Sequence, residues 1–489
     1  MVSFIDSISL WGLVAALLQL TIIAGVILRV MLTRHPPGSS FAWILITTIL
    51  PYVGFLLYLM FGERPIGQIR ARRFRQMIDM WSRVAKHKLT PTGPLPLPLA
   101  RHRALIHLAV RMGKLPVTSG SSIKLLSTTD TMFEAMLKDI RSAKDSIDME
   151  FYIWADGGKE NLISQALLAA HERGVAVRIL VDDFGAREFL AGETCVLFRA
   201  SGIEVASAMP MRFLRFFGLQ RADIRLHRKT VIIDDQIGYT GSLNMIDPHT
   251  YDAAATVGSW VDAMVRLEGP AVTSLKSVFL HDWSLQPDGD MSDIERLMVD
   301  RFVPQPGEAT VVTVPSGPDS EREQNLFLLL EAINAARFSL TITTPYFVPN
   351  EVLATAILNA AYRGVTVSLI IPEKADSDMV GWAARRYFDD LLSAGVRILL
   401  YKGGLLHTKS VAVDDEFAVF GTVNFDNRSL HLNFEMMLLI FDPDFLQSLN
   451  ALHASYETHS YTVDPAGWRD RRFAEKLKEG AAFLISPLL

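Results

Sequence analysis

Two long apolar runs open the chain and separate its beginning from the rest of the sequence. Residues 10–30 and 41–61 are each about twenty residues long, the length that a helix needs to cross a bilayer. A short segment rich in proline and glycine lies between them and is typical of a turn. We therefore predict a membrane-embedded helical hairpin over residues 1–62. It either spans the membrane or, because Pro51 interrupts the second run, enters it as a shallow re-entrant pair.

The first run differs from a cleaved signal peptide. Its opening residues carry Asp6 and no lysine or arginine, and a second apolar run follows at once. We therefore expect the hairpin to be retained in the mature protein.

A basic segment and a proline-rich linker occupy residues 63–120. Five arginines follow the second apolar run, namely Arg64, Arg70, Arg72, Arg73 and Arg75. Positive charge beside a membrane helix favours the cytoplasmic side, so we expect the bulk of the chain in the cytoplasm. The same arginines could also bind anionic lipid headgroups. Residues 89–100 contain repeated proline and are typical of an extended linker.

Beyond the linker, two segments repeat one alternation of strands and helices. In residues 121–290, a strand over 146–153 precedes a helix ending at Gly174 and a strand over 175–181. In residues 309–460, the matching elements are 340–347, a helix ending at Gly364, and 365–371. Strand–helix–strand order predicts an α/β fold, a sheet flanked by helices. Two copies predict a pseudo-twofold molecule with one composite site between the repeats. A basic and apolar tail, residues 461–489, follows.

Composition narrows the function. The 489 residues carry a net charge of −5, which argues against a general nucleic-acid binder. Cys195 is the single cysteine, so an intrachain disulfide and a cysteine-rich metal site are both excluded.

One constellation of polar residues, His-x-Lys-x-x-x-x-Asp, occurs twice. Its copies are His227, Lys229 and Asp234, then His407, Lys409 and Asp414. Each copy is followed by a turn of small residues that contains a hydroxyl and ends in asparagine: Ser242 and Asn244, then Thr422 and Asn424. Only 12 histidines occur in the chain, so a coincidental repeat is improbable. We expect each His–Lys pair to lie on one face of a strand, because residues two apart share a face.

These residue types suit chemistry at a phosphodiester without a metal. The lysines offset the charge of the phosphate oxygens, and the asparagines add hydrogen bonds. A neutral imidazole can attack phosphorus, while a second, protonated imidazole gives its proton to the departing alkoxide. No cluster of carboxylates indicates a metal ion, so we expect neither a metal nor a cofactor.

The doubled motif resembles the paired signature of the phospholipase D superfamily. Together with the hairpin, Leu50-Pro51-Tyr52-Val53-Gly54 within it, and the sequence Gly403-Gly404-Leu405-Leu406-His407, it resembles the bacterial cardiolipin synthases of type A. The resemblance implies a phosphatidyltransferase that joins two phosphatidylglycerol molecules, releasing glycerol and forming cardiolipin through a phosphohistidine.

The resemblance also implies roles for particular residues. It makes His227 the nucleophile and His407 the acid. Downstream carboxylates orient the histidine of the partner repeat, which pairs Glu435 with His227 and Asp262 with His407. The two motif aspartates are expected to hold the local backbone rather than to touch substrate.

A lipid substrate implies membrane contact. We expect an anionic bilayer as partner, no nucleic acid, and location in the bacterial inner membrane, with a homo-oligomer allowed. Residues 211–219 and 468–489 mix arginine with apolar side chains, so each is either an interfacial element or ordinary packed structure. A phospholipid hydrolase remains the nearest alternative. A nuclease and a non-catalytic phosphate-binding scaffold are further ones.

Overall fold

The computed structural model describes residues 2–33, 37–62, 97–209, 223–249, 257–286, 303–318 and 323–486. The described residues up to 62, with 223 and 224, belong to one compact unit, and those over 97–209 and 225–486 to another. The basic cluster at 64–75, most of the linker at 89–100, and the 211–219 segment lie outside the described residues.

The first unit contains the N-terminal helices α1 (Val2–Leu32), α2 (Pro37–Ile49) and α3 (Pro51–Leu57), with a π-helical turn over Tyr58–Gly62. Within the described part of the chain, one helix is long and apolar enough to cross a membrane, over Trp11–Leu32 of α1. That criterion concerns length and composition only.

The second apolar run does not form one continuous helix. The helix breaks at Leu50, because Pro51 has no backbone N–H to continue the helical hydrogen bonds. Pro51 instead begins α3. Helix α3 turns back along α2, so closely that a Cβ on Gly54 would lie 2.6 Å from the Cα of Thr47. Helix α2 has 13 residues and α3 has 7, each well short of the roughly 20 that span a bilayer. The second apolar run therefore forms two short helices, whereas the first forms one long helix.

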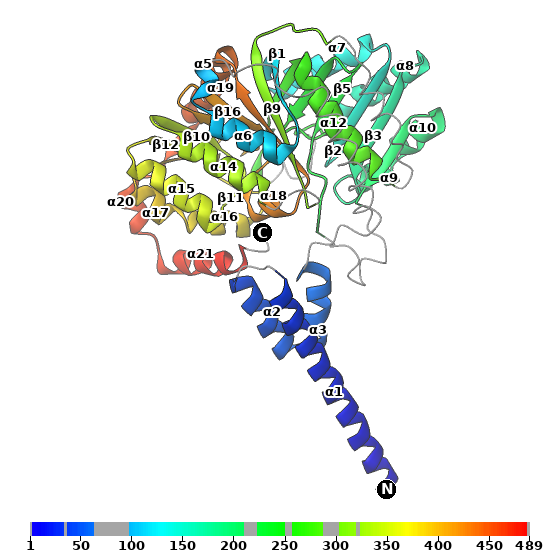
Figure 1. The fold of residues 1–489 in the computed structure, drawn as a ribbon, viewed down its shortest axis with the longest axis vertical. Coiled ribbons are helices and arrows are strands. Elements are labelled where there is room, and N and C mark those ends of the chain that lie inside the picture. The colour runs from blue at the N-terminus through cyan, green and yellow to red at the C-terminus, as the bar shows by residue number, and fades with distance from the viewer. Residues whose placement is uncertain are drawn as a thin grey trace. The chain divides into compact units, whose positions relative to one another are not determined.

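The second unit is built on one mixed sheet of 15 strands in the order β19-β13-β12-β10-β15-β16-β18-β9-β1-β8-β6-β5-β2-β3-β4. The order β13-β12-β10-β15-β16-β18-β9 in one half matches β4-β3-β2-β5-β6-β8-β1 in the other. Strands β1 and β9 pair antiparallel at the centre and join the halves. The predicted α/β fold with two phospholipase D-like repeats is confirmed, and Figure 1 shows the two halves side by side.

The first repeat contains β1 (Val117–Leu126), α7 (Thr129–Ser142), β2 (Ser146–Phe151), α8 (Glu160–Glu172), β3 (Ala176–Asp182), α9 (Arg187–Ala191), α10 (Glu193–Ser201), β4 (Glu204–Ala208), β5 (Thr230–Ile233), β6 (Ile237–Gly241), β7 (Trp260–Val261), β8 (Met264–Glu268) and α12 (Pro270–Ser284). Gly174 ends the segment after α8 with a φ of 92°, as the predicted cap requires.

The second repeat contains β9 (Ala309–Ser316), α14 (Gln324–Ala335), β10 (Ser339–Thr343), β11 (Phe347–Val348), α15 (Glu351–Tyr362), β12 (Thr366–Pro372), α16 (Asp378–Arg385), α17 (Phe388–Ser393), β13 (Arg397–Tyr401), β14 (Leu405–Leu406), β15 (Ser410–Val413), β16 (Phe417–Gly421), β17 (Phe425–Asp426), α18 (Asn427–His431), β18 (Glu435–Phe441), α19 (Pro443–Thr458) and β19 (Ser460–Thr462). The predicted strand over 340–347 is shorter than expected, because Pro345 interrupts it.

Each repeat has its own apolar core between sheet and helices. Ile147, Met149 and Phe151 of β2 are fully buried in the first, as are Leu340 and Ile342 of β10 in the second. The folded part begins earlier than the predicted linker boundary. Helices α5 (Leu97–Ala100) and α6 (Arg103–Gly113) and the start of β1 lie within residues assigned to that segment. The tail forms α20 (Pro465–Arg469) and α21 (Phe473–Ile485).

Candidate active site

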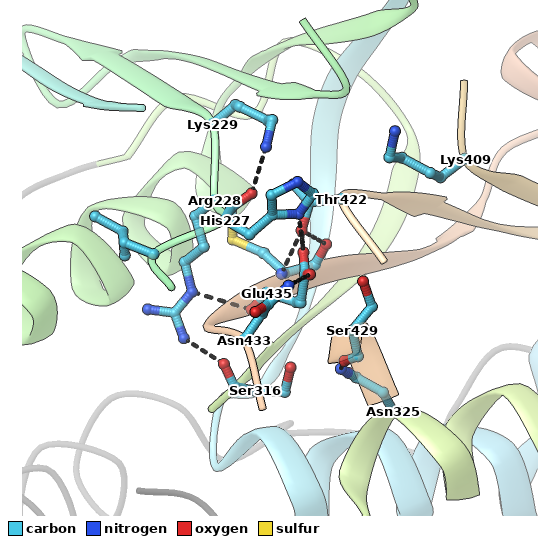
Figure 2. A network of polar contacts seen from close by, with 12 residues as sticks. His227, Arg228, Lys229, Ser316, Asn325, Lys409, Thr422, Ser429, Asn433 and Glu435 are labelled. Atoms are coloured by element: carbon cyan, nitrogen blue, oxygen red, sulfur yellow. Dashed lines mark hydrogen bonds and ion pairs between the residues drawn. The ribbon is translucent and has the colours of Figure 1, made fainter. Parts of the chain in front are cut away.

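The two His–Lys pairs lie immediately before equivalent strands. They were predicted to be within a strand, but β5 begins at Thr230 and β15 at Ser410, one residue after each lysine. In both copies the lysine ammonium donates to the backbone carbonyl of the motif histidine. Lys229 Nζ donates to the carbonyl of His227 at 2.7 Å, whereas Arg228 between them donates to the Glu435 and Ser316 carbonyls (Figure 2).

Each histidine is held by a carboxylate from the other repeat. His227 Nδ1 lies 2.9 Å from Glu435 Oε2, and His407 Nδ1 lies 2.7 Å from Asp262 Oδ1. Backbone bonds set this pairing, since the His227 N–H donates to Phe434 O and the His407 N–H donates to Val261 O, both at 2.9 Å. These are the pairs expected from the sequence, and Figure 2 shows the first of them.

The motif hydroxyls orient the carboxylates. Ser242 Oγ donates to Asp262 Oδ1 at 2.6 Å and receives the Ala263 N–H at 3.0 Å. Thr422 Oγ1 donates to Glu435 Oε2 at 2.6 Å and receives the Met436 N–H at 2.9 Å. Both hydroxyls are buried, so they fix the carboxylates that fix the imidazoles.

Burial controls the protonation of the site. It lowers the pKa of His227 to about 4 and that of His407 to about 3, so both imidazoles are neutral near pH 7. Burial opposes ionisation of Asp262 and Glu435, but the adjacent histidines and lysines outweigh it and hold both pKa values below their usual range. Each carboxylate is therefore an anion that accepts the Nδ1–H of a neutral imidazole, which leaves the Nε2 lone pair available.

The lysines are also buried. Desolvation lowers the pKa of Lys229 to about 8 and that of Lys409 to about 7. An anionic ligand between them would favour their charged forms, because an opposite charge nearby stabilises an ammonium.

Both histidines and both asparagines line one cavity of about 370 Å³. Asn244 Oδ1 accepts the Ile153 N–H at 3.2 Å, and Asn424 Oδ1 is buried without a hydrogen-bond partner. The cavity is also lined by residues that the sequence reasoning missed: Tyr152, Arg225, Trp260, Tyr346, Asp376, Asp426, Arg428 and Asn433. Trp260 and Asn433 precede the orienting carboxylates by two residues, a same-face spacing that could have revealed them.

The motif aspartates hold turns rather than line the cavity. The Asp234 carboxylate accepts the backbone N–H groups of Lys144, Asp145 and Ser146. Asp414 accepts those of Arg337, Phe338 and Ser339. Although both were counted with the catalytic motif, these contacts agree with the expectation that they support the backbone.

The arrangement offers two imidazole groups that line one cavity and two buried lysines beside them. Such a site can stabilise the charge of a phosphoryl group while one imidazole attacks it and the other transfers a proton. In the described part of the chain, no group of three or more His, Cys, Asp or Glu side chains could hold a metal ion.

Known proteins resemble this chain over almost its whole length. It is 40% identical over 474 residues to cardiolipin synthase A of Edwardsiella ictaluri (strain 93-146), covering 96% of each chain. It is 40% identical over 480 residues to cardiolipin synthase A of Pectobacterium carotovorum subsp. carotovorum (strain PC1), with the same coverage.

A solved structure shares the fold. Phosphatidylserine synthase of Haemophilus influenzae Rd KW20 superposes with a TM-score of 0.56 at 17% identity, covering 79% of this chain and 100% of that one. Residues 10–63 match the family described as phospholipase D-nuclease N-terminal. Residues 136–283 and 329–455 match the family described as cardiolipin synthase, PLD-like domain, and the chain therefore belongs to that family.

Proposed function

We propose that the protein is a cardiolipin synthase, a phosphatidyltransferase that converts two phosphatidylglycerol molecules into cardiolipin and glycerol. One observation carries the proposal: two neutral imidazoles, each bonded through Nδ1 to a carboxylate of the other repeat, line one cavity together. The relatives named cardiolipin synthase A point to the same reaction.

The first half-reaction forms a phosphohistidine. His227 Nε2 attacks the phosphorus of the donor lipid, and the bond from phosphorus to the oxygen of the headgroup glycerol breaks. The departing alkoxide takes a proton from the imidazolium of His407. The anionic substrate favours that imidazolium, as it favours the charged lysines.

The second half-reaction runs the same steps in reverse with a new alcohol. Neutral His407 accepts the proton of a hydroxyl on a second phosphatidylglycerol, whose oxygen then attacks phosphorus. The phosphorus–nitrogen bond breaks and returns His227 to its starting form. Lys229, Lys409, Asn244 and Asn424 stabilise the non-bridging oxygens throughout.

The protein acts at the bacterial inner membrane, with the catalytic unit on the cytoplasmic side. Three features support this placement: the apolar span of α1, the arginines after residue 62, and a row of exposed apolar side chains on α21. The break at Leu50 favours one crossing by α1 with a re-entrant α2–α3 pair, instead of the two crossings predicted.

The test is product analysis. Purified protein is incubated with phosphatidylglycerol carrying label in the phosphate, and the lipids are separated. Cardiolipin with released glycerol is expected, and phosphatidic acid alone would instead indicate a hydrolase. His227→Ala and His407→Ala should each abolish turnover, whereas His107→Ala, on the exposed face of α6, should not. No lipid turnover by the unaltered protein would leave the nuclease or scaffold alternatives.

A separate experiment tests which histidine is the nucleophile and which is the acid. Acid-quenched protein is digested, and the labelled peptide is identified. Label on His227 supports its role as nucleophile, whereas label on His407 alone would reverse the two roles.

A further inference from the structure

The pseudo-twofold relation pairs each cavity residue with a counterpart in the other repeat. Aligning His227 with His407 pairs Arg225 with Leu405, and aligning Asn244 with Asn424 pairs Ile246 with Asp426. The Asn244 alignment also pairs Pro248 with Arg428. Aligning Asp262 with Glu435 pairs Trp260 with Asn433, and aligning Ser146 with Ser339, which bond to the two motif aspartates, pairs Ile153 with Tyr346. Matching backbone bonds from both histidines support this correspondence.

One half of the cavity is apolar. Trp260 and Ile153 line it, and Ile246 and Leu405 pack behind them in one cluster. The Trp260 ring lies against His407, with 4.6 Å between ring centroids. We call these four residues the apolar half.

The counterparts of these four residues, together with Arg428, are polar or charged, and we call them the polar half. All of them line the cavity: Arg225, Tyr346, Asp426, Arg428 and Asn433. Asn433 Nδ2 donates to Glu435 Oε1 at 3.1 Å, the carboxylate that holds His227. The symmetry of the scaffold is therefore broken at these pairs, because Arg225, Asp426, Arg428 and Asn433 replace Leu405, Ile246, Pro248 and Trp260.

Two acceptor groups in the polar half suit hydroxyl ligands. Asn433 Oδ1 is buried without a hydrogen-bond partner, although its residue lines the cavity. Asp426 is buried and lines the same cavity. It accepts the Ser429 N–H at 2.7 Å and a hydrogen bond from the Asn424 side chain, and a carboxylate has acceptor sites for further donors. A buried acceptor left unpaired is costly, so a donor from a ligand would stabilise this side.

The two arginines suit an anion. Guanidinium groups pair with phosphate through two parallel hydrogen bonds, a geometry that lysine does not offer. Lys229 and Lys409 are related by the pseudo-twofold and stabilise the reacting phosphate in the proposed reaction. Arg225 and Arg428 have no charged counterpart in the other repeat. A second anionic group close to the first is therefore the ligand that these residues fit.

Cardiolipin synthesis supplies such a ligand. The attacking hydroxyl of the acceptor lipid is joined through a three-carbon glycerol unit to the acceptor's own phosphodiester. Water and free glycerol carry no second phosphate.

We propose that the polar half is a subsite for the headgroup of the acceptor lipid. Arg225 and Arg428 bind its phosphodiester, and Asn433 and Asp426 accept hydrogen bonds from its glycerol hydroxyls. The inference rests on the proposed function and adds to it a determinant of acceptor choice.

Two reactions that share a donor test the subsite. The first is cardiolipin formation from phosphatidylglycerol, and the second is exchange of its headgroup with labelled free glycerol. Arg225→Leu installs the residue found at the symmetry-related position. This variant should lower the rate of cardiolipin formation by about 10- to 100-fold. The rate of headgroup exchange with glycerol should stay within about threefold of that of the unaltered protein. Arg428→Leu should give the same pattern independently.

Controls separate charge in the subsite from charge in general. Arg187 stacks on Phe184, as Arg225 does, with distances of 5.3 Å and 4.8 Å to the ring centroid, but its side chain is 63% exposed. Arg187→Leu should leave both reactions unchanged, and Arg225→Lys should restore part of the cardiolipin formation.

Three other outcomes would contradict the acceptor subsite or the function on which it rests. An equal fall in both reactions for folded Arg225→Leu and Arg428→Leu would assign the arginines to the donor step. No fall in either reaction would show that no subsite exists. If the unaltered protein forms neither cardiolipin nor exchange product, the proposed function itself fails.

Discussion

At the scale of single residues, the chemistry depends on which nitrogen of each imidazole carries the proton. Glu435 and Asp262 accept the Nδ1–H of His227 and His407, which directs the Nε2 lone pairs away from the carboxylates. Thr422 and Ser242 each donate a short bond to one of these carboxylates and hold it in position.

Replacing Glu435 tests this orientation. Glu435→Gln keeps the shape but can present an amide N–H to Nδ1, which favours the wrong tautomer. We expect kcat to fall by about 10²- to 10⁴-fold with little change in KM. Steady-state kinetics on short-chain phosphatidylglycerol measures this. His107→Ala, on the exposed face of α6, should leave kcat unchanged. Equal losses would contradict the orienting role.

The buried lysines predict an alkaline limit to activity. Burial lowers the pKa of Lys409 to about 7 and that of Lys229 to about 8, so the free enzyme loses positive charge as the pH rises through these values. We expect kcat/KM to fall on the alkaline side, since an uncharged amine no longer offsets the phosphate. Lys409→Met should be slow at every pH and lose the lower of the two steps. A flat alkaline profile in the unaltered protein would exclude this account.

At the scale of elements, local sequence predicted the repeated strands and helices well and the catalytic segments less well. The His–Lys spacing fits a strand, yet both pairs precede β5 and β15. Their backbone N–H groups bond across to Phe434 and Val261 instead of to a neighbour in the main sheet. A pattern along one segment does not reveal such a partner, because the partner comes from the other repeat.

Helix α21 offers a prediction about membrane contact. Arg471, just before it, bonds to Asp389 and Glu479, and Ala482 is buried in one cluster with Val348 and Ala383. The outer face of the helix presents apolar side chains with large exposed fractions: Phe473 80%, Leu477 62% and Leu484 80%. An amphipathic helix with such a face binds at the bilayer boundary.

Changing these three residues together to serine should lower activity on phosphatidylglycerol vesicles by about tenfold, because vesicle contact weakens. Activity on monomeric short-chain phosphatidylglycerol should stay near normal. Val196→Ser with Leu197→Ser, on exposed positions of α10, provides the matched control. Equal losses on both substrates would instead indicate damage to the fold.

At the scale of the whole molecule, the number of membrane crossings by the N-terminal helices determines on which side of the membrane the N-terminus lies. One crossing by α1 places residue 3 in the periplasm and residue 39 in the cytoplasm. Two crossings would reverse both positions. The close approach of Gly54 to Thr47 favours the single crossing, because it makes α2 and α3 a folded-back pair.

Thiol labelling distinguishes these topologies. Cys195 is buried, so it gives little background reaction with an impermeant reagent. In intact spheroplasts, Ser3→Cys should react and Ser39→Cys should not. After the membrane is permeabilised, both should react, which controls for accessibility. The opposite labelling pattern would support two crossings.

The sequence alone determined much of this protein. Repeated motifs and the glycine caps at Gly174 and Gly364 revealed two copies of one fold. The doubled His–Lys pattern predicted the reacting groups, and the expected carboxylates, Glu435 and Asp262, are the ones that contact the histidines. Such features are local, or are copies of a local feature, and can be read along the chain.

Tertiary structure decided the rest. Glu435 lies 208 positions from His227, and Asp262 lies 145 positions from His407, so only the closing of the two half-sheets brings each pair together. The same closure brings Arg225, Asp426 and Asn433 together with the apolar residues Ile153 and Trp260 around one cavity. Polarity of a site is a property of side chains that converge from distant segments. Sequence periodicity predicts only which residues within one segment share a face.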